Sequence, residues 1–114
     1  MPITLYHNPR CSKSRAALAL LEERGVRPKI VEYLKTPPDA AELARILSLL
    51  DMRPRDLLRP KEAREAGIDP ALDGAALIAA MVANPAVIER PIAVGEDGAR
   101  VGRPPDRVLE LLDD

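Results

Sequence analysis

The sequence predicts an α/β domain in which helices cover a four-stranded mixed sheet and a helical segment interrupts the sheet-forming parts of the chain. Two observations carry this prediction. A strand, a helix and a second strand come first, and two strands and a helix come last. Between them lies a stretch whose apolar residues recur at helical spacing.

The first part of the chain is a strand–helix–strand unit. Residues 3–6 form a short apolar, β-prone run that is typical of a buried strand. Residues 12–24 carry apolar side chains at helical spacing, and Gly25 follows as expected of a residue that ends a helix. Residues 30–34 predict a second strand, which we expect to run parallel to the first because a helix connects them.

The middle of the chain, approximately residues 37–88, predicts an inserted helical subdomain within one domain spanning residues 1–114. Asp39 has a glutamate three residues later, a capping-box pattern, and an apolar helix face follows it. Residues 53–58 predict a short helix, whereas residues 61–67 predict a polar surface segment. Asp73 is expected to cap a further helix. The expected buried face of that helix consists of Leu77, Ile78, Met81 and Val82.

The last part of the chain predicts a hairpin and a helix. Residues 92–94 and 99–101 are β-prone and flank a four-residue loop that contains two glycines. Pro105 stands at an early position of a helix that runs to Leu112 with one apolar face.

Composition limits the functions that the chain can have. The 114 residues are 46% hydrophobic, which suits one domain with a real core. The net charge of −1 provides no basic field for nucleic acid. Apolar runs are far shorter than the ~20 residues that span a bilayer, so we expect no membrane segment. Without a basic region followed by an apolar one at the N-terminus, we expect no signal peptide and a cytoplasmic location. We also expect a monomer, because no feature of the sequence demands a larger assembly.

Cys11 is the only cysteine, which excludes an intramolecular disulfide and a Cys-rich zinc site, and no metal site is expected. It follows a predicted strand and opens a predicted helix, where backbone N–H groups favour an anion. Arg10, Lys13 and Arg15 add positive charge nearby. Thiols in such places have pKa values of roughly 3.5–7.5, so we predict a reactive thiolate that needs a thiol from another molecule. The alternative is a buried structural cysteine.

Five further residues are candidates for the same chemistry. Ser14 stands where a dithiol enzyme carries its second cysteine, and its hydroxyl could either bond to the thiolate or cap the helix. His7, the only histidine, could lower the thiol pKa or simply bond to the loop backbone. Arg59, Arg90 and Arg103 each precede a proline. Forked guanidinium groups bind a tetrahedral oxyanion well, although each arginine could equally be a solvated surface residue.

Residues 6–15, Tyr-His-Asn-Pro-Arg-Cys-Ser-Lys-Ser-Arg, resemble the active-site loop of the glutaredoxin-dependent arsenate reductase (ArsC) family. The resemblance extends over nearly the whole chain and points to the YfgD-like branch of this family, which is related to Spx. Downstream segments with the family's order and spacing are residues 57–59, 84–85, 89–92 and 102–104. One departure is Ser12, where well-studied members often carry glycine.

The resemblance implies a thioredoxin-like fold with an inserted helical subdomain, in which Cys11 matches the nucleophile. His7 and Ser14 would match residues that tune the thiolate, together with the nearby charge of Arg15. Pro91 would match the cis-proline of the thioredoxin fold, although only about 5–6% of X–Pro bonds are cis. The arginines that would match those binding arsenate and its arsenite adduct are Arg59, Arg90 and Arg103.

The chemistry implied by the resemblance needs no tightly bound cofactor. The thiolate of Cys11 attacks arsenate, glutathione acts as co-substrate to reduce As(V) to As(III), and glutaredoxin resolves the resulting mixed disulfide. Two alternatives remain open at this point. One is an Spx-type module that binds RNA polymerase, although Ser14 removes the usual Cys-x-x-Cys switch. The other is a thiol-transferase acting on glutathione mixed disulfides.

Overall fold

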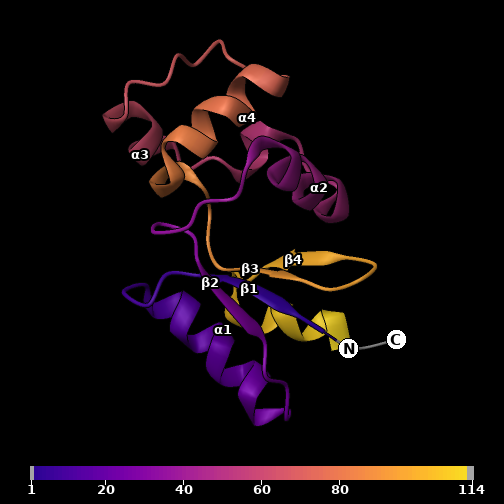
Figure 1. Ribbon diagram of the computed structural model, residues 1–114. Coiled ribbons are helices and arrows are strands. Elements are labelled where there is room, and N and C mark those ends of the chain that lie inside the picture. Colours follow the sequence, from indigo (N-terminus) through magenta and orange to yellow (C-terminus); the bar gives the residue numbers. More distant parts are fainter. Residues whose placement is uncertain (1, 113–114) are drawn as a thin grey trace. The chain divides into compact units, whose positions relative to one another are not determined.

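The computed structural model describes residues 2–112, which form two compact units. The first unit comprises Met1–Thr36 and Arg90–Asp114, and the second comprises Pro37–Glu89 (Figure 1). Each unit has its own buried side chains and is described by itself.

A four-stranded mixed sheet forms the centre of the first unit, as predicted. Its strands are β1 (Thr4–His7), β2 (Lys29–Glu32), β3 (Ile92–Val94) and β4 (Ala99–Val101). The strand order is β2-β1-β3-β4. β1 pairs with β2 in parallel and with β3 in antiparallel orientation, and β3 and β4 form the predicted hairpin. The central position of β1 places its carboxyl end, and the loop that follows, next to residues from the distant β3.

Two helices cover one face of this sheet (Figure 1). They are α1 (Ser12–Glu23) and η3 (Pro105–Leu112), and the latter is a 3-10 helix. The core between them is entirely aliphatic, which follows from a sequence that lacks Phe and Trp. Its buried members are Ile3, Leu5, Ala17, Leu21, Ala93 and Val108.

The ends of α1 were predicted well from the sequence, whereas the end of β2 was not. α1 begins at Ser12 as expected, and Gly25 ends it with a φ of 78°, a left-handed conformation that glycine adopts without strain. The strand expected over residues 30–34 instead ends at Glu32. The backbone N–H groups of Lys35 and Thr36 both donate to the Glu32 carbonyl oxygen at 2.9 Å, which turns the chain.

The second unit is helical. Its elements are α2 (Ala40–Leu50), η1 (Pro54–Leu57), α3 (Pro60–Glu65), α4 (Gly74–Ala83) and η2 (Pro85–Val87). The Asp39 side chain caps α2 as predicted by accepting a hydrogen bond from the Glu42 N–H at 2.8 Å. The segment 61–67, expected to be a polar surface stretch, contributes most of α3. This helix has six residues, and only Ala63 among them is buried, so its sequence shows no helical repeat of apolar residues.

A short antiparallel bridge ties two distant segments of the second unit together. Leu58 pairs with Ile88. The Arg59 N–H donates to the Val87 carbonyl oxygen at 2.7 Å, and the Glu89 N–H donates to the Leu57 carbonyl oxygen at 2.8 Å. The bridge therefore fixes the backbone of residue 59 and of residue 89 within one small ladder.

Across residues 2–112, no helix combines the length and the apolar character required to cross a membrane.

Candidate active site

The loop between β1 and α1 holds Cys11 at the N-cap of α1. The Cys11 N–H donates to the Asn8 carbonyl oxygen at 3.0 Å, and the Arg10 N–H donates to Asn8 Oδ1 at 3.0 Å. The Cys11 carbonyl oxygen accepts the first helical hydrogen bond, from the Arg15 N–H at 3.0 Å. The backbone of Cys11 is extended, with φ −92° and ψ 123°. The thiol is therefore placed where the first N–H groups of the helix have no partner within it.

Several donors around Cys11 shift its pKa. Burial raises the pKa, but hydrogen bonds from the Ser14 N–H, the Arg90 side chain and the Lys13 N–H lower it, as does the charge of Arg90. The combined effect lowers the pKa below the ordinary thiol value. This direction is expected for a thiol at a helix N-terminus beside a guanidinium group, and it favours the nucleophilic thiolate.

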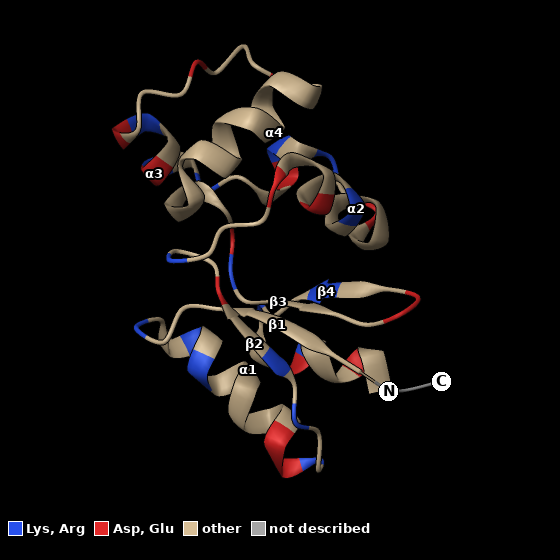
Figure 2. Cartoon of the chain, viewed as in Figure 1, with Lys and Arg blue, Asp and Glu red and all other residues tan. Residues whose placement is uncertain are grey.

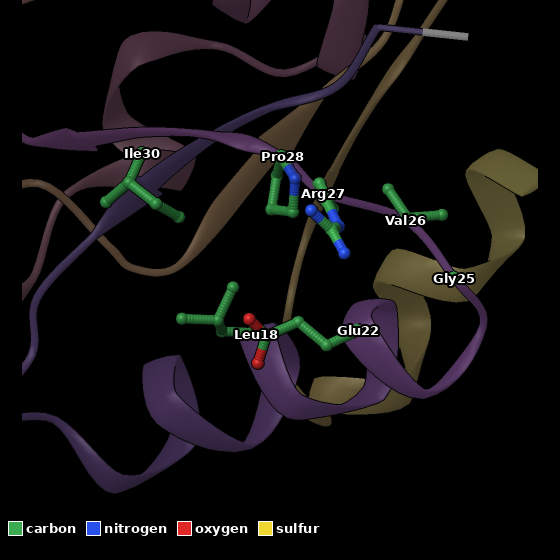
Figure 3. A pocket seen from close by; sticks show the side chains of 7 residues that line it. All are labelled: Leu18, Glu22, Gly25, Val26, Arg27, Pro28 and Ile30. Carbon is green, nitrogen blue, oxygen red and sulfur yellow. The ribbon is translucent and has the colours of Figure 1, made fainter.

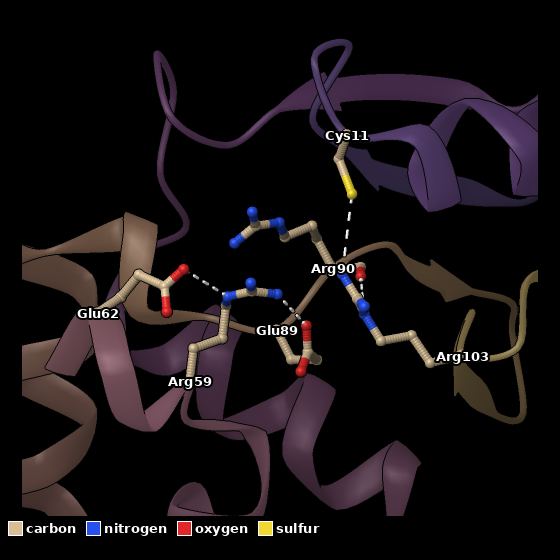
Figure 4. Close-up of polar contacts among 6 residues, drawn as sticks. All are labelled: Cys11, Arg59, Glu62, Glu89, Arg90 and Arg103. Atoms are coloured by element: carbon tan, nitrogen blue, oxygen red, sulfur yellow. Dashed lines mark hydrogen bonds and ion pairs between the residues drawn. The ribbon is translucent and has the colours of Figure 1, made fainter.

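Arg103 reaches the same sulfur from beyond β4. Its Nη2 atom lies 3.7 Å from Cys11 Sγ, and its Nε atom donates to the Arg90 carbonyl oxygen at 2.8 Å (Figure 4). The Arg90–Pro91 peptide bond is cis, which is the geometry that the family resemblance implied, and the Arg103–Pro104 bond is cis as well. The Arg103 guanidinium therefore contacts the Cys11 sulfur directly, while Arg90 and the N–H groups of Lys13 and Ser14 lower the pKa of the thiol.

Gly102 permits the close approach of the segments that carry these arginines. Its N–H donates to the Pro91 carbonyl oxygen at 2.9 Å. A Cβ atom at residue 102 would lie only 2.7 Å from Pro91 Cγ, which is closer than real Cβ contacts come. The glycine therefore lets the backbone before Arg103 pack against Pro91.

His7 and Ser14 form a buried pair beneath the loop. His7 Nδ1 lies 2.6 Å from Ser14 Oγ, which also accepts a hydrogen bond from the Asn8 N–H at 3.0 Å. Burial lowers the pKa of His7, the charge of Arg15 lowers it further, and Glu32 acts in the opposite direction. We therefore assign His7 as neutral, with Nδ1 accepting the Ser14 hydroxyl proton. Ser14 approaches Cys11 with its backbone N–H, while its hydroxyl holds the loop through His7 and Asn8.

Arg15 closes the loop from outside. Its Nη1 atom donates to the Pro9 carbonyl oxygen at 3.0 Å, and its side chain is exposed. The basic residues of this region lie on the loop and the first turn of α1 (Figure 2). Arg15 thus acts on the loop and on the pKa of His7, and Lys13 contributes to the site through its backbone.

Arg59 belongs to the second unit and is ion-paired there. Its Nε atom donates to Glu62 Oε2 at 2.9 Å, and its Nη1 atom donates to Glu89 Oε1 at 2.6 Å (Figure 4). Burial acts to lower the pKa of Arg59, but the hydrogen bonds and charges of both glutamates raise it above its ordinary value. Of the candidate arginines, Arg90 and Arg103 accompany Cys11 in the first unit.

Four residues that shape these environments were not among the candidates predicted from the sequence: Asn8, Glu62, Glu89 and Gly102. Glu62 could have been found, because a glutamate three residues after an arginine at a helix start is a usual pairing distance. Asn8 before Pro9 is likewise a typical turn residue. The partnership of Glu89 with Arg59 spans 30 residues and has no local signal.

A separate surface hollow of about 620 Å³ lies between the C-terminal half of α1 and β2 (Figure 3). None of the residues that line it is among the candidate site residues. The lining residues are Leu18, Glu22, Gly25, Val26, Arg27, Pro28 and Ile30.

The sheet order and this site define a thioredoxin-like protein with one cysteine at the start of its first helix. The chain belongs to the ArsC family, whose model matches residues 6–111. It is 52% identical to the uncharacterized protein YfgD of Escherichia coli (strain K12), with 96% of each chain covered. It is 47% identical to a protein of Neisseria meningitidis (serogroup A) named arsenate reductase, covering 96% of this chain and 97% of the relative.

The fold is shared with solved structures of the same family. A Vibrio cholerae structure named arsenate reductase matches with a TM-score of 0.90 and 46% identity. The match covers 96% of this chain and 97% of that chain. These similarities confirm the family and the thioredoxin-like fold expected from the sequence.

Proposed function

We propose that the protein is an oxidoreductase that reduces arsenate to arsenite through a covalent adduct on Cys11. One observation carries the proposal: the Cys11 sulfur has a lowered pKa and lies 3.7 Å from the guanidinium of Arg103, with Arg90 also bonding to it. A thiolate supplies the nucleophile, and the arginines supply the positive charge that an oxyanion needs.

The first step forms the sulfur–arsenic bond. The Cys11 thiolate attacks As(V), and an oxygen of arsenate leaves as water after taking up protons. Arg90 and Arg103 neutralise negative charge on the remaining oxygens, and they are already in place beside the sulfur. Donors that are fixed before the reaction stabilise developing charge without reorganisation.

The second step transfers two electrons to arsenic. A glutathione thiolate attacks the Cys11 sulfur, the sulfur–arsenic bond breaks, and its electron pair remains on arsenic, which leaves as As(III). The two thiols are oxidised to one mixed disulfide, so the electrons balance. Because Cys11 is the only cysteine, an outside thiol must release it, and we assign this step to glutaredoxin.

Other residues have supporting parts in the proposal. His7 and Ser14 hold the loop so that the N–H groups of residues 13 and 14 can donate hydrogen bonds to the Cys11 sulfur. On the strength of the family resemblance, we extend oxyanion binding to Arg59 of the second unit. Cys11, Arg90 and Arg103 all come from one chain, so a monomer suffices. A glutathione-dependent cycle suits the cytoplasm, where thiols stay reduced.

The relatives support the same assignment. The Neisseria meningitidis and Haemophilus influenzae proteins named arsenate reductase are 47% and 41% identical to this chain over nearly its full length. YfgD, at 52% identity, has no activity in its name, so the substrate must be tested directly on this chain.

The test is a coupled assay with purified protein, arsenate, glutathione, glutaredoxin, glutathione reductase and NADPH. We expect NADPH consumption that depends on arsenate and disappears in Cys11→Ser. Omitting glutaredoxin should slow turnover and let the glutathionylated protein accumulate. Turnover no faster than that of Cys11→Ser would refute the proposal, and activity on a small glutathione mixed disulfide without arsenate would favour a thiol-transferase.

A further inference from the structure

Arg59 in the second unit is held by two carboxylates at once. Glu62 Oε2 accepts from Nε at 2.9 Å, and Glu89 Oε1 accepts from Nη1 at 2.6 Å. The three side chains are 21%, 25% and 27% exposed, respectively. Pairs that are this far removed from solvent are screened less than surface ion pairs, whose contribution is small.

The backbone fixes each member of this group independently. Arg59 is the N-cap of α3, and Glu62 lies one turn into that helix. Glu89 comes from the other side of the antiparallel bridge, where its N–H bonds to the Leu57 carbonyl oxygen and the Arg59 N–H bonds to the Val87 carbonyl oxygen. Leu57 and Val87 are almost fully buried. The carboxylates therefore approach the guanidinium from two rigid segments.

The two contacts leave part of the guanidinium available. Arginine has five N–H donors in a planar fork. Glu62 takes the Nε–H and Glu89 takes one Nη1–H, so the other Nη1–H and both Nη2–H groups lie outside these two hydrogen bonds. Because the group is planar, holding two of its edges also sets the direction of the remaining donors.

We infer that Glu62 and Glu89 are positioning residues, which hold the Arg59 guanidinium so that its remaining N–H donors can bind the substrate oxyanion. The inference rests on the proposed function, in which Arg59 binds arsenate. An unrestrained arginine loses much side-chain freedom when it binds a ligand, whereas a restrained one has lost it already. The glutamates should therefore act on the affinity for arsenate, and so on KM, more than on kcat.

A competing idea predicts the opposite effect of the glutamates on the affinity for arsenate. Two carboxylates beside one guanidinium bring negative charge close to it, so they could compete with an anion for Arg59. In that case, removing a glutamate would strengthen arsenate binding. Alanine and glutamine variants separate the two ideas, because glutamine loses the charge but keeps an oxygen that accepts a hydrogen bond.

The kinetic experiment compares Glu62→Ala and Glu89→Ala with Glu62→Gln and Glu89→Gln in the coupled arsenate assay. We expect each alanine variant to raise KM roughly tenfold, the loss of one charge-assisted hydrogen bond, with kcat nearly unchanged. Each glutamine variant should recover most of the lost affinity. Glu65→Ala, at the exposed end of α3, is the matched control and should leave KM unchanged. Unchanged or lower KM values in the alanine variants would overturn the inference.

A second measurement does not depend on turnover. In nuclear magnetic resonance spectra, the Arg59 Nε–H signal, assigned with Arg59→Lys, should exchange slowly with water. It should become fast in Glu62→Ala and stay slow in Glu65→Ala. If the wild-type protein did not reduce arsenate, the proposed function would fail while this signal still tested the positioning. An Arg59 signal that exchanges as fast as those of exposed arginines would refute the positioning itself.

Discussion

The Nη2 atom of Arg103 lies 3.7 Å from the Sγ atom of Cys11, although 92 residues separate the two in the chain. A hydrogen bond from Arg103 Nε to the Arg90 carbonyl oxygen keeps the guanidinium in this direction. The pair joins the start of α1 to the segment after β4, and it places a permanent positive charge beside the nucleophile.

Replacing Arg103 with alanine should weaken the use of arsenate. Because one charged donor to the oxyanion is lost, we expect kcat/KM to fall at least roughly tenfold in the coupled assay. Urea denaturation should show a much smaller effect, since the side chain is only partly buried. Arg24→Ala, at the exposed opposite end of α1, is the control. A loss of stability large enough to account for the lost activity would mean that Arg103 is structural.

The thiol pKa of Cys11 should rise when Arg90 is replaced with glutamine. Arg90 lowers this pKa both by hydrogen bonding and by its charge, although burial of the thiol opposes it. A lowered pKa increases the thiolate fraction at neutral pH, so alkylation by iodoacetamide should reach its plateau rate at a lower pH than for a free thiol. In Arg90→Gln, the midpoint of that curve should move to higher pH. An identical midpoint in both proteins would contradict the assigned cause.

Ser14→Ala should destabilise the protein, because it removes the partner of both His7 Nδ1 and the Asn8 N–H at a fully buried position. Leaving buried polar groups without partners costs about 1–3 kcal/mol, which urea denaturation can resolve. Ser12→Ala, at an exposed position two residues earlier, should change the free energy of unfolding by less than about 0.5 kcal/mol. Equal effects of the two substitutions would argue against the buried network.

The folded protein should lose stability as the pH falls below about 6.5, the ordinary histidine pKa, in a way that depends on His7. Burial lowers the pKa of His7 in the folded state, so the unfolded chain takes up this proton first. The stability that depends on His7 is therefore fully present above the pKa that His7 has in the unfolded chain. It declines as the pH falls, until the pH has passed the lower pKa that His7 has in the folded protein. The free energy of unfolding of His7→Gln should change less over the same interval. A His7 pKa at or above 6.5, measured by magnetic resonance, would contradict this.

Features with local causes could be predicted from the sequence. α1 and the hairpin of β3 and β4 follow from helical spacing, a terminal glycine and a glycine-containing loop, all within short stretches of chain. The Asp39 cap is equally local. The position of Cys11 at a helix N-cap followed from the strand before it and the helix after it.

Features that depend on distant residues could not be predicted from spacing. The segment 30–34 has a strand-like sequence to its end, whereas a turn at Glu32 ends β2 and Tyr33 is buried beyond it. α3 has six residues, too few to show a period. The contact of Arg103 with Cys11 and that of Arg59 with Glu89 depend on how the chain returns over 92 and 30 residues. The local sequence therefore left each arginine as either an oxyanion ligand or a surface residue, and only the family resemblance favoured the first role.

Because Cys11 carries the only thiol of the chain, mass spectrometry of the intact protein can follow each covalent step at this residue. With no second thiol among the 114 residues to receive or exchange a covalent group, a thiol-bound adduct that survives quenching must sit on one known atom. An added mass equal to arsenate less water, or to glutathione less two hydrogen atoms, would identify the step at which a sample was stopped. Rapid quenching followed by intact-mass measurement can therefore time the order of events directly, without labels or engineered reporters.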